Sequence, residues 1–464
     1  MIEKNEVLKM AAGLSLNPDT VEKDYILGWM LFGINQHPEL STWAFKGGTS
    51  LKKCFFETFR FSEDLDFTLS DKSHLTELFL VQNFIKVTDF LSEEVGIVFF
   101  KDRFKFKIID KGNGNYSAQC KIHYNGPLRR KQGVTTIKLD LTTDEILVLK
   151  TVKKEVHHPY TDHPINGIQA NCYAFEEIVA EKIRALAQRA RPRDLYDVIH
   201  FFRNREMIDN PKLVYNVLRK KCSFKKFEVP TFRHIEEHEK LDELEPQWEN
   251  MLAHQLPHLP PMASFWIDLS PFFDWLQGQL TEDTLVSVST KDEIIFQPGR
   301  IFDAYSIDSV LQKIQFAAAN RICVKFGYND KVRTVEPLSF RTAKSGNNLF
   351  YGFERDAGHT KSYTLAKIQS VEITNLAYTE KYPVEISSTG LISMPPIRRK
   401  QADYTRVSYN PRTTLRRKDP KYKYQCPVCD KYFYRKNNNS RLNAHKSKNG
   451  WPCSGRFGVY IGYG

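Results

Sequence analysis

The sequence predicts a multidomain chain that begins with an α/β domain and ends in smaller modules. Residues 1–205 alternate helical and strand-like hydrophobic patterns, and residues 206–280 are mostly helical in pattern. Strands that alternate with helices are typical of a sheet covered by helices. A set of cysteine and histidine residues with metal-ligand spacing lies near the C-terminus. The length of 464 residues is enough for about two to four domains, each with its own core.

The composition predicts where these domains meet. Residues 281–300 have weak periodicity and indicate a linker between residues 1–280 and a strand-rich domain at residues 301–385. Residues 386–424 combine prolines with many cations, which indicates an extended basic linker. Residues 425–464 then form a small last module.

The positive charge of the chain is concentrated at its C-terminal end. Residues 396–464 contain 17 Lys and Arg against 3 Asp and Glu, whereas the whole chain has a net charge of +12. A confined basic segment is typical of a surface that binds a polyanion, usually nucleic acid. A solvated, disordered tail is the alternative.

The hydropathy pattern argues against a membrane or secreted protein. No apolar run approaches the roughly 20 residues that a membrane-spanning helix needs, and the charged N-terminus does not resemble a signal peptide. The scattered cysteines fit reduced thiols better than a disulfide framework. We therefore expect a cytoplasmic protein with no membrane partner.

The first chemical motif begins with a glycine pair. Residues 43–46 predict a short strand, and Gly47 and Gly48 permit a tight turn with close approach of the backbone to a ligand. Thr49 and Ser50 then begin a helix. The free amide groups at such a helix start can bind an anion such as a triphosphate.

Three aspartates are expected on the polar faces of two strands. In FSEDLDFTL, side chains alternate, so Asp64 and Asp66 point to one side and the apolar residues to the other. In TTIKLDLT, Asp140 lies on the polar face in the same way, although simple solvation would also explain it. Mg²⁺ prefers carboxylate and phosphate oxygens, and paired ions assist phosphoryl transfer. The three carboxylates are therefore candidate catalytic magnesium ligands.

A later segment, AFEEIVAEKIRALAQRARPRDLYDVIHFF, predicts two helices. Lys182 and Arg189 fall on or beside the apolar stripe of the first helix, where a cation is costly unless it meets an anion. A phosphate or a catalytic carboxylate is a natural partner, and the alternative is that both side chains extend past the stripe to solvent. Asp194 and Asp197 lie in the first turns of the second helix, where acidic residues are also common as partners of the helix dipole.

Together these motifs resemble those of a known family. The blocks GGTSLKK, SEDLDF, EKIRAL and RPRDLYD look like the four motifs of the AbiEii/AbiGii-type toxin nucleotidyltransferases, members of the polymerase-β-like superfamily, over roughly residues 1–280. The resemblance implies an α/β (α+β) fold with a mixed sheet and a helical C-terminal half. It implies NTP binding with Mg²⁺ or Mn²⁺, and Asp64 and Asp66 as metal ligands. Such proteins are commonly toxins of toxin–antitoxin or phage-defence systems, so a cognate antitoxin is a possible partner.

The resemblance also implies roles for individual residues. Lys182 would be catalytic and Asp194 a possible general base. The nucleotide would be bound by the glycine-rich block and by residues of the third and fourth motifs: Gly47, Gly48, Thr49, Ser50, Lys52, Lys53, Glu177, Lys182, Arg189 and Asp197.

Residues 305–378 resemble a WYL domain, a small SH3-like β-barrel of prokaryotic regulators that senses ligands or nucleic acid. The matching segments include IQFAAANRICVKFGYND and SYTLAKIQSVEIT. The family triplet is replaced by Leu349-Phe350-Tyr351, and the usual Asp-Arg pair by Ala366-Lys367. Candidate regulatory anion contacts are Arg333, Arg341, Arg355 and Lys367, and an ordinary charged surface is the alternative for each.

The last module predicts a zinc site. Cys426 and Cys429 have zinc-knuckle spacing, and His445 and Cys453 supply two further ligands. A tetrahedral Cys-Cys-His-Cys site is closed and structural, and a module of this size needs such a site because it cannot build a sufficient core alone.

These observations favour a metal-dependent nucleotidyltransferase that moves an NMP from an NTP to an acceptor and releases pyrophosphate. RNA is the expected acceptor, with tRNA the leading candidate. One alternative is a non-enzymatic WYL/zinc-finger regulator that binds nucleic acid and has a nucleotide-sensing front domain. Another is a nucleotidyltransferase that modifies protein.

Overall fold

The structure is a computed structural model of the whole chain. It describes residues 1–56, 59–130, 135–279, 294–295, 309–343, 345–386, 422–435, 439–446, 452–455 and 457–463. The chain forms two compact units, Met1–Ile397 and Arg398–Gly464. The expected linkers at 281–300 and 386–424 lie almost wholly outside the described residues. Among the described helices, none is long and apolar enough to cross a membrane.

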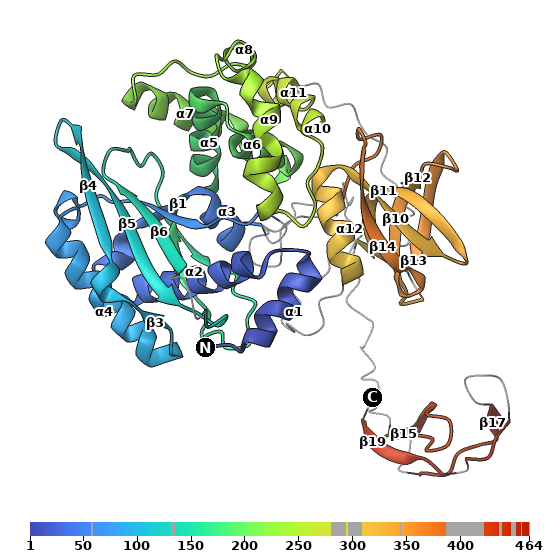
Figure 1. Ribbon diagram of the computed structural model, residues 1–464. Helices are drawn as coiled ribbons and strands as arrows, with labels where there is room; N and C mark the ends of the chain where they lie inside the picture. The colour runs from blue at the N-terminus through green and yellow to red at the C-terminus, as the bar shows by residue number, and fades with distance from the viewer. Residues whose placement is uncertain are drawn as a thin grey trace, which may run out of the picture. The chain divides into compact units, whose positions relative to one another are not determined.

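The first unit begins with an eight-stranded mixed sheet (Figure 1). Its strands are β1 (Ala44–Lys46), β2 (Asp64–Thr68), β3 (Val98–Phe99), β4 (Lys105–Gly112), β5 (Asn115–Asn125), β6 (Thr135–Thr142), β7 (Val152–Glu155) and β8 (Gln169–Cys172). Their order is β3-β5-β6-β2-β1-β8-β7, and β4 pairs with β5. Strand β2 runs parallel to β6 and antiparallel to β1. The predicted mixed α/β fold is confirmed.

Helices precede the strands of this sheet, lie between them and follow them. They are α1 (Lys4–Leu14), α2 (Pro18–Gln36), α3 (Gly47–Cys54), α4 (Glu77–Val95), α5 (Phe175–Arg189), α6 (Pro192–Arg203), α7 (Pro211–Phe224), α8 (Phe232–Glu236), α9 (Leu244–Leu252), α10 (Met262–Trp266) and α11 (Leu269–Leu276). Figure 1 shows α5 to α11 gathered into one group beside the sheet. This group is the helical C-terminal half that the sequence predicts.

Local sequence sets where the central helices begin. Helix α2 starts at Pro18, and the Asn17 side chain caps it by accepting a hydrogen bond of 2.9 Å from the Asp19 amide. Helix α6 likewise has proline, Pro192, at its first position. Proline suits this position because its missing N–H would have no partner inside the helix.

An aromatic cluster joins the segment after α3 to helices α5 and α6. The Phe56 and Phe59 rings lie 4.8 and 5.0 Å from the ring of His200 on α6, and Phe56 also contacts Phe175 and Phe201. His200 is fully buried, and burial lowers the pKa of its imidazole to about 3, so the ring is neutral. This packing fixes α5 and α6 against the segment that joins α3 to β2.

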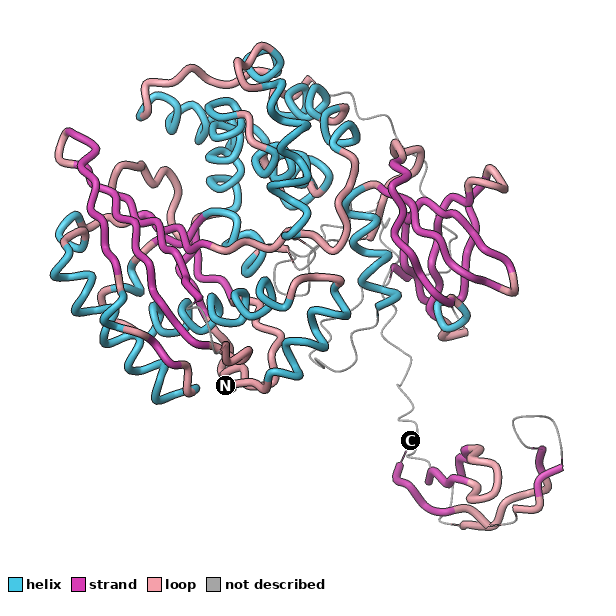
Figure 2. Tube along the Cα trace, viewed as in Figure 1, coloured by secondary structure: helices cyan, strands magenta, loops and turns pink. Residues whose placement is uncertain are grey.

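The first unit also contains a second, antiparallel sheet of six strands (Figure 2). Its strands are β9 (Ile294–Ile295), β10 (Ile322–Tyr328), β11 (Lys331–Thr342), β12 (Asn348–Glu354), β13 (His359–Thr364) and β14 (Gln369–Ala377). Helix α12 (Ser309–Asn320) lies between β9 and β10 in the chain. The order is β13-β12-β11-β10-β14, with β9 paired to β11. Antiparallel strands are thus found where a strand-rich domain is predicted, and the SH3-like barrel stays a prediction.

The second unit consists of short strands in its described residues. They are β15 (Tyr422–Gln425), β16 (Tyr432–Arg435), β17 (His445–Lys446), β18 (Pro452–Cys453) and β19 (Val459–Tyr463). They form a three-stranded sheet, β16-β15-β19, and a pair, β17-β18. The buried cluster of this unit contains only Tyr424, Leu442 and two of the cysteines, as far as the chain is described.

Candidate active site and zinc site

Strand register brings the three predicted aspartates to one face of the first sheet. Asp66 on β2 lies opposite Asp140 on the parallel strand β6, and Asp64 lies two residues before Asp66. Residues that pair across strands, and residues two apart along a strand, share a face. Lys46 on β1 lies opposite Asp66 from the other side. The face therefore holds three carboxylates and two ammonium groups, Lys46 and also Lys138, which lies opposite Asp64 on β6.

Burial and mutual repulsion perturb these carboxylates. The pKa of Asp66 is raised to about 6, chiefly by burial and also by Asp140 and Asp64, while Lys46 and Lys182 act in the opposite direction. Burial also raises the pKa values of Asp64 and Asp140. Carboxylates in such an arrangement are costly to ionise unless a cation joins them.

Gly47 allows helix α3 to begin directly against Asp66. Its φ of +79° is one that side chains rarely adopt, and a Cβ atom at Gly47 would lie 2.1 Å from the Asp66 carboxylate oxygen Oδ2. The next glycine is also confined, because a Cβ at Gly48 would lie 2.9 Å from Ser62 Oγ. Gly47 is therefore needed for the close approach of the helix start to Asp66, and Gly48 for its close approach to Ser62.

The hydroxyl groups of the glycine-rich block hold the backbone in place. Thr49 Oγ1 donates to the carbonyl oxygen of Asp64 at 2.5 Å, and Ser50 Oγ donates to the carbonyl of Gly47 at 3.1 Å. Both residues are buried. The Thr49 hydroxyl thus ties α3 to β2, whereas the Ser50 hydroxyl bonds within α3. The part of this block that can face an anion is its backbone amides.

The two lysines of the same block have other surroundings. Lys53 is buried, and its ammonium group donates to the Asp24 carboxylate at 2.6 Å and to the His157 carbonyl at 3.3 Å. Lys52 is also largely buried, with Nζ 4.6 Å from the centre of the Phe61 ring. The structure therefore groups Lys53 with a buried carboxylate of α2, away from the three aspartates.

Lys182 on α5 connects the carboxylate face to helix α6. Its ammonium nitrogen lies 2.6 Å from Asp197 and 3.5 Å from Asp194, and both aspartates are fully buried. Arg189 makes two hydrogen bonds to Asp194, at 2.6 and 2.9 Å. Arg60 likewise donates two hydrogen bonds to the two carboxylate oxygens of Asp197, both at 2.8 Å. The structure thus brings the predicted residues of the last two motifs into one ion-pair network.

This network keeps Asp197 charged. Burial alone would raise the pKa of Asp197, but Arg60 and Lys182 hold it below its ordinary value. Lys182 in turn acts on Asp66, whose pKa it lowers. Asp194 is held by two cations on its two oxygens, which leaves it poorly suited to take up a proton from an acceptor.

Two charged residues beside the aspartates were not singled out from the sequence. Lys46 donates to Glu181 at 2.8 Å, and Glu181 also meets the buried Lys221 at 3.3 Å. Burial alone would raise the pKa of Glu181, but Lys46 and Lys221 hold it well below its ordinary value. Lys46 is the strand residue directly before Gly47, a position that could have been recognised as facing the site.

Glu177, a predicted nucleotide contact, lies deeper in the same network. It is fully buried, and Lys221 lies 3.1 Å from one of its oxygens. It also accepts hydrogen bonds from the amides of Val148 and Leu149, at 2.9 and 2.8 Å. Glu177 therefore fastens the loop before β7 to α5, and it shares Lys221 with Glu181.

Arg193 is a further residue that sequence reasoning missed. It is half-buried at the second position of α6, and its Nε atom has no hydrogen-bond partner in the described structure. Burial and the neighbouring Arg60 lower its pKa, whereas Asp64 and Glu63 are close enough to raise it. Arg193 is thus a candidate contact for a phosphate near Asp64, and the second arginine of RPRDLYD was its signal.

The predicted zinc ligands of the second unit meet in space. One ligand atom from each of Cys426, Cys429, His445 and Cys453 lies within 4.8 Å of the others. Cys429 Sγ is 3.3 Å from His445 Nε2, and Cys426 Sγ is 3.8 Å from Cys453 Sγ. The donor set of three thiols and one imidazole fits a tetrahedral zinc site.

The predicted anion contacts of the second sheet are mostly engaged with carboxylates. Arg333 lies 2.6 Å from Glu354, and Arg355 lies 3.1 Å from Glu336. Arg341 is buried and pairs with Glu385. Lys367 is exposed. Each of the three arginines therefore has a carboxylate partner.

Comparison with known proteins assigns the class of the chain and then its family. A family model described as "Nucleotidyl transferase AbiEii toxin, Type IV TA system" matches residues 29–278, which is more than half of the chain. The chain is therefore a nucleotidyltransferase by class. It belongs to the AbiEii family of toxins from type IV toxin–antitoxin systems.

Two solved structures are similar to the chain at low identity. The crystal structure of JHP933 from Helicobacter pylori is 16% identical in sequence, with a TM-score of 0.37. The match covers 57% of this chain and 94% of the JHP933 chain. A second H. pylori chain, described as a "putative nucleotidyltransferase", is 18% identical, covers 57% and 97%, and has a TM-score of 0.36. None of the curated proteins matches the sequence.

Proposed function

We propose that the chain transfers a nucleoside monophosphate from an NTP to an acceptor, with divalent metal held by Asp64, Asp66 and Asp140. One observation carries the proposal: the register that sets Asp66 beside Asp140 and two residues from Asp64 on one face. The donor set of three carboxylates fits Mg²⁺ or Mn²⁺. When bound, the metal would neutralise the phosphates and polarise the α-phosphate for attack.

The chain's own groups would position the substrate around this face. The free amides at the start of α3 would hold the terminal phosphates, because Gly47 brings them against Asp66. Lys182, fixed by Asp194 and Asp197, would stabilise charge that develops on the leaving pyrophosphate.

The acceptor hydroxyl must lose its proton as the new P–O bond forms and the bond to pyrophosphate breaks. Asp140 is the better candidate to take this proton, since its pKa is raised and it lies on the carboxylate face. Asp194 is the weaker candidate for the base, because Arg189 and Lys182 occupy its oxygens. In this scheme Asp194 positions Lys182.

The proposed acceptor is RNA, with tRNA as the leading candidate. The excess of 17 cations over 3 acids at residues 396–464 supports a polyanionic partner. The four-ligand cluster of the second unit would bind zinc and hold that unit's fold. The WYL-like residues 301–385 would regulate the enzyme or recruit nucleic acid. As a member of a type IV toxin family, the protein would be counteracted by a cognate antitoxin.

The direct test is incubation of the full chain with each α-³²P-labelled NTP, Mg²⁺ and total cellular RNA, followed by gel analysis. We expect the label to enter RNA, most strongly a band of tRNA size, with one preferred NTP. Label in a protein band alone would favour protein modification. No label in any macromolecule with any NTP and either Mg²⁺ or Mn²⁺ would contradict the proposal.

A further inference from the structure

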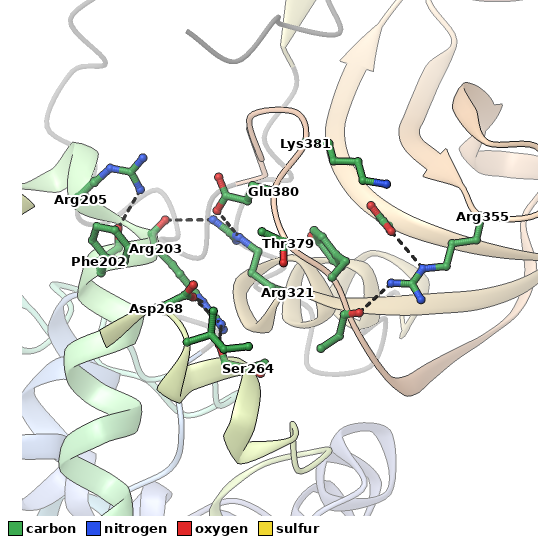
Figure 3. A pocket seen from close by; sticks show the side chains of 14 residues that line it. Phe202, Arg203, Arg205, Ser264, Asp268, Arg321, Arg355, Thr379, Glu380 and Lys381 are labelled. Carbon is green, nitrogen blue, oxygen red and sulfur yellow. Dashed lines mark hydrogen bonds and ion pairs between the residues drawn. The ribbon is translucent and has the colours of Figure 1, made fainter. Parts of the chain in front are cut away.

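The first unit contains a pocket of about 540 Å³ apart from the carboxylate face (Figure 3). It is lined by side chains from the end of α6 and the residues that follow it, from the segment between α10 and α11, and from the second sheet and its flanks. We call it the junction pocket. Its volume lies in the range of ligand-binding clefts, about 300–1,000 Å³.

The junction pocket is rich in charged groups, and most of them are paired. Three ion pairs contribute to its wall: Arg203 with Asp268 at 2.8 Å, Arg321 with Glu380 at 2.6 Å, and Arg355 with Glu336 at 3.1 Å. These pairs use every carboxylate among the lining residues. Two further cations, Arg205 and Lys381, also line the pocket.

Arg205 and Lys381 form no ion pair within the part of the chain that the structure describes. Arg205 donates to the backbone carbonyl of Phe202 at 3.2 Å, and Lys381 Nζ lies 4.7 Å from the centre of the Phe353 ring. Figure 3 shows the two side chains on opposite sides of the pocket. The pocket thus carries an excess of two positive charges, one at each side.

Helix α6 separates this pocket from the carboxylate face. Asp194 and Asp197 lie in the first turns of α6, whereas Arg203 is its last residue. Asp194 lies about 13 Å and Asp197 about 9 Å from Arg203 along the helix axis, at about 1.5 Å per residue. A ligand in the junction pocket would therefore be distinct from the nucleotide at the three aspartates.

We propose that the junction pocket binds a small organic molecule that carries two separated phosphate groups. Guanidinium and ammonium groups that lack a carboxylate partner are the usual phosphate donors in proteins. A single phosphate would meet only one of the two cations, since they lie on opposite sides. Between these two cations lie Thr379 and paired charged residues such as Arg321 and Glu380. They could form hydrogen bonds to hydroxyl groups on the part of the ligand that joins its two phosphates.

The test is calorimetric binding to the full chain without added divalent metal, so that nucleotide binding at the aspartates is suppressed. The probes are fructose 1,6-bisphosphate and adenosine 3′,5′-bisphosphate, with fructose 6-phosphate as the single-phosphate comparison. We expect at least one bisphosphate to bind with one site per chain, and fructose 6-phosphate to bind more weakly than fructose 1,6-bisphosphate.

Variants decide whether the junction pocket is the site. Arg205→Ala and Lys381→Ala should each weaken binding of the bisphosphate by about tenfold or more, because each removes a charge-assisted contact. The matched control is Arg219→Ala/Lys220→Ala, which removes two exposed cations of α7 and should leave the affinity unchanged. If melting shows that an alanine variant is unfolded, Arg205→Gln or Lys381→Gln replaces it. Unchanged affinity in both pocket variants, or no saturable binding of either bisphosphate, overturns the proposal.

Discussion

Replacing Asp66 with asparagine should make the metal-free protein more stable while it stops nucleotide transfer. Burial raises the pKa of Asp66 from an ordinary 3.8 to about 6, so the fold prefers the protonated form. The stability of the wild type therefore falls as pH rises from about 4 through about 6, and the loss is complete above that range. At 1.36 kcal/mol per pKa unit, this loss is at most about 3 kcal/mol. Asparagine mimics the neutral carboxylic acid and cannot ionise, so the Asp66→Asn variant avoids this loss of stability.

The assay is thermal melting of wild type and Asp66→Asn at pH 5 and pH 7.5, with and without Mg²⁺. Without metal, the variant should melt higher than the wild type at pH 7.5, with a smaller difference at pH 5. Added Mg²⁺ should stabilise the wild type through binding and leave the variant nearly unchanged. Transfer of labelled NMP should fall at least about a thousandfold, since a metal ligand supplies several kcal/mol of transition-state stabilisation.

The control is Asp274→Asn, which changes an exposed aspartate of α11. It should alter neither the melting temperature at either pH nor the transfer rate. Two results would refute the reasoning: an Asp66→Asn variant that is less stable than the wild type at pH 7.5 without metal, or one that keeps the wild-type transfer rate.

Three further predictions follow from the other contacts. Lys53→Met should destabilise the fold by about 3–5 kcal/mol, because it leaves Asp24 buried without its cation. The KM for NTP should stay unchanged in the fraction that remains folded. A raised KM would instead support the nucleotide role predicted from the sequence. Freshly purified protein should contain one zinc per chain by elemental analysis, and Cys429→Ser should lose it; an unchanged zinc content in that variant would be the contrary result. Deleting residues 396–464 should weaken RNA binding and make its affinity less dependent on salt, by about one unit of log affinity per log salt for each RNA phosphate that the tail neutralises. NTP binding measured by calorimetry should survive the deletion. Equal salt dependence for both proteins would show that the tail does not bind RNA.

The sequence was most informative where the pattern is local. Alternation along two strands predicted that Asp64, Asp66 and Asp140 would face away from the core, and the structure gathers them on one face. The glycine pair predicted a close backbone approach, and the distance from a Cβ at Gly47 to Asp66 gives the reason. Both inferences depend on spacing of a few residues, which backbone geometry fixes without knowledge of the rest of the fold.

The partners of buried charges could not be predicted in this way. Lys53 and Glu177 belong to motifs, yet their contacts are Asp24 and the loop at residues 148–149, which are 29 or 28 positions away in the sequence. Arg60 reaches Asp197 across 137 positions. Periodicity indicates that a cation points inward, but the carboxylate that it meets is set by how distant helices pack.

The ion pairs of α6 explain how Asp194 and Asp197 can be buried close to the face that already holds three carboxylates. Asp194 and Asp197 each bind an arginine through two oxygens and share Lys182. Two aspartates with three cations leave a net positive charge next to Asp66. That charge partly offsets the repulsion among the three carboxylates, and it lowers the pKa of Asp66 from the still higher value that burial would give. An aspartate that is buried and doubly paired thus holds Lys182 in place, and its removal should disturb Lys182 before it disturbs Asp64, Asp66 and Asp140.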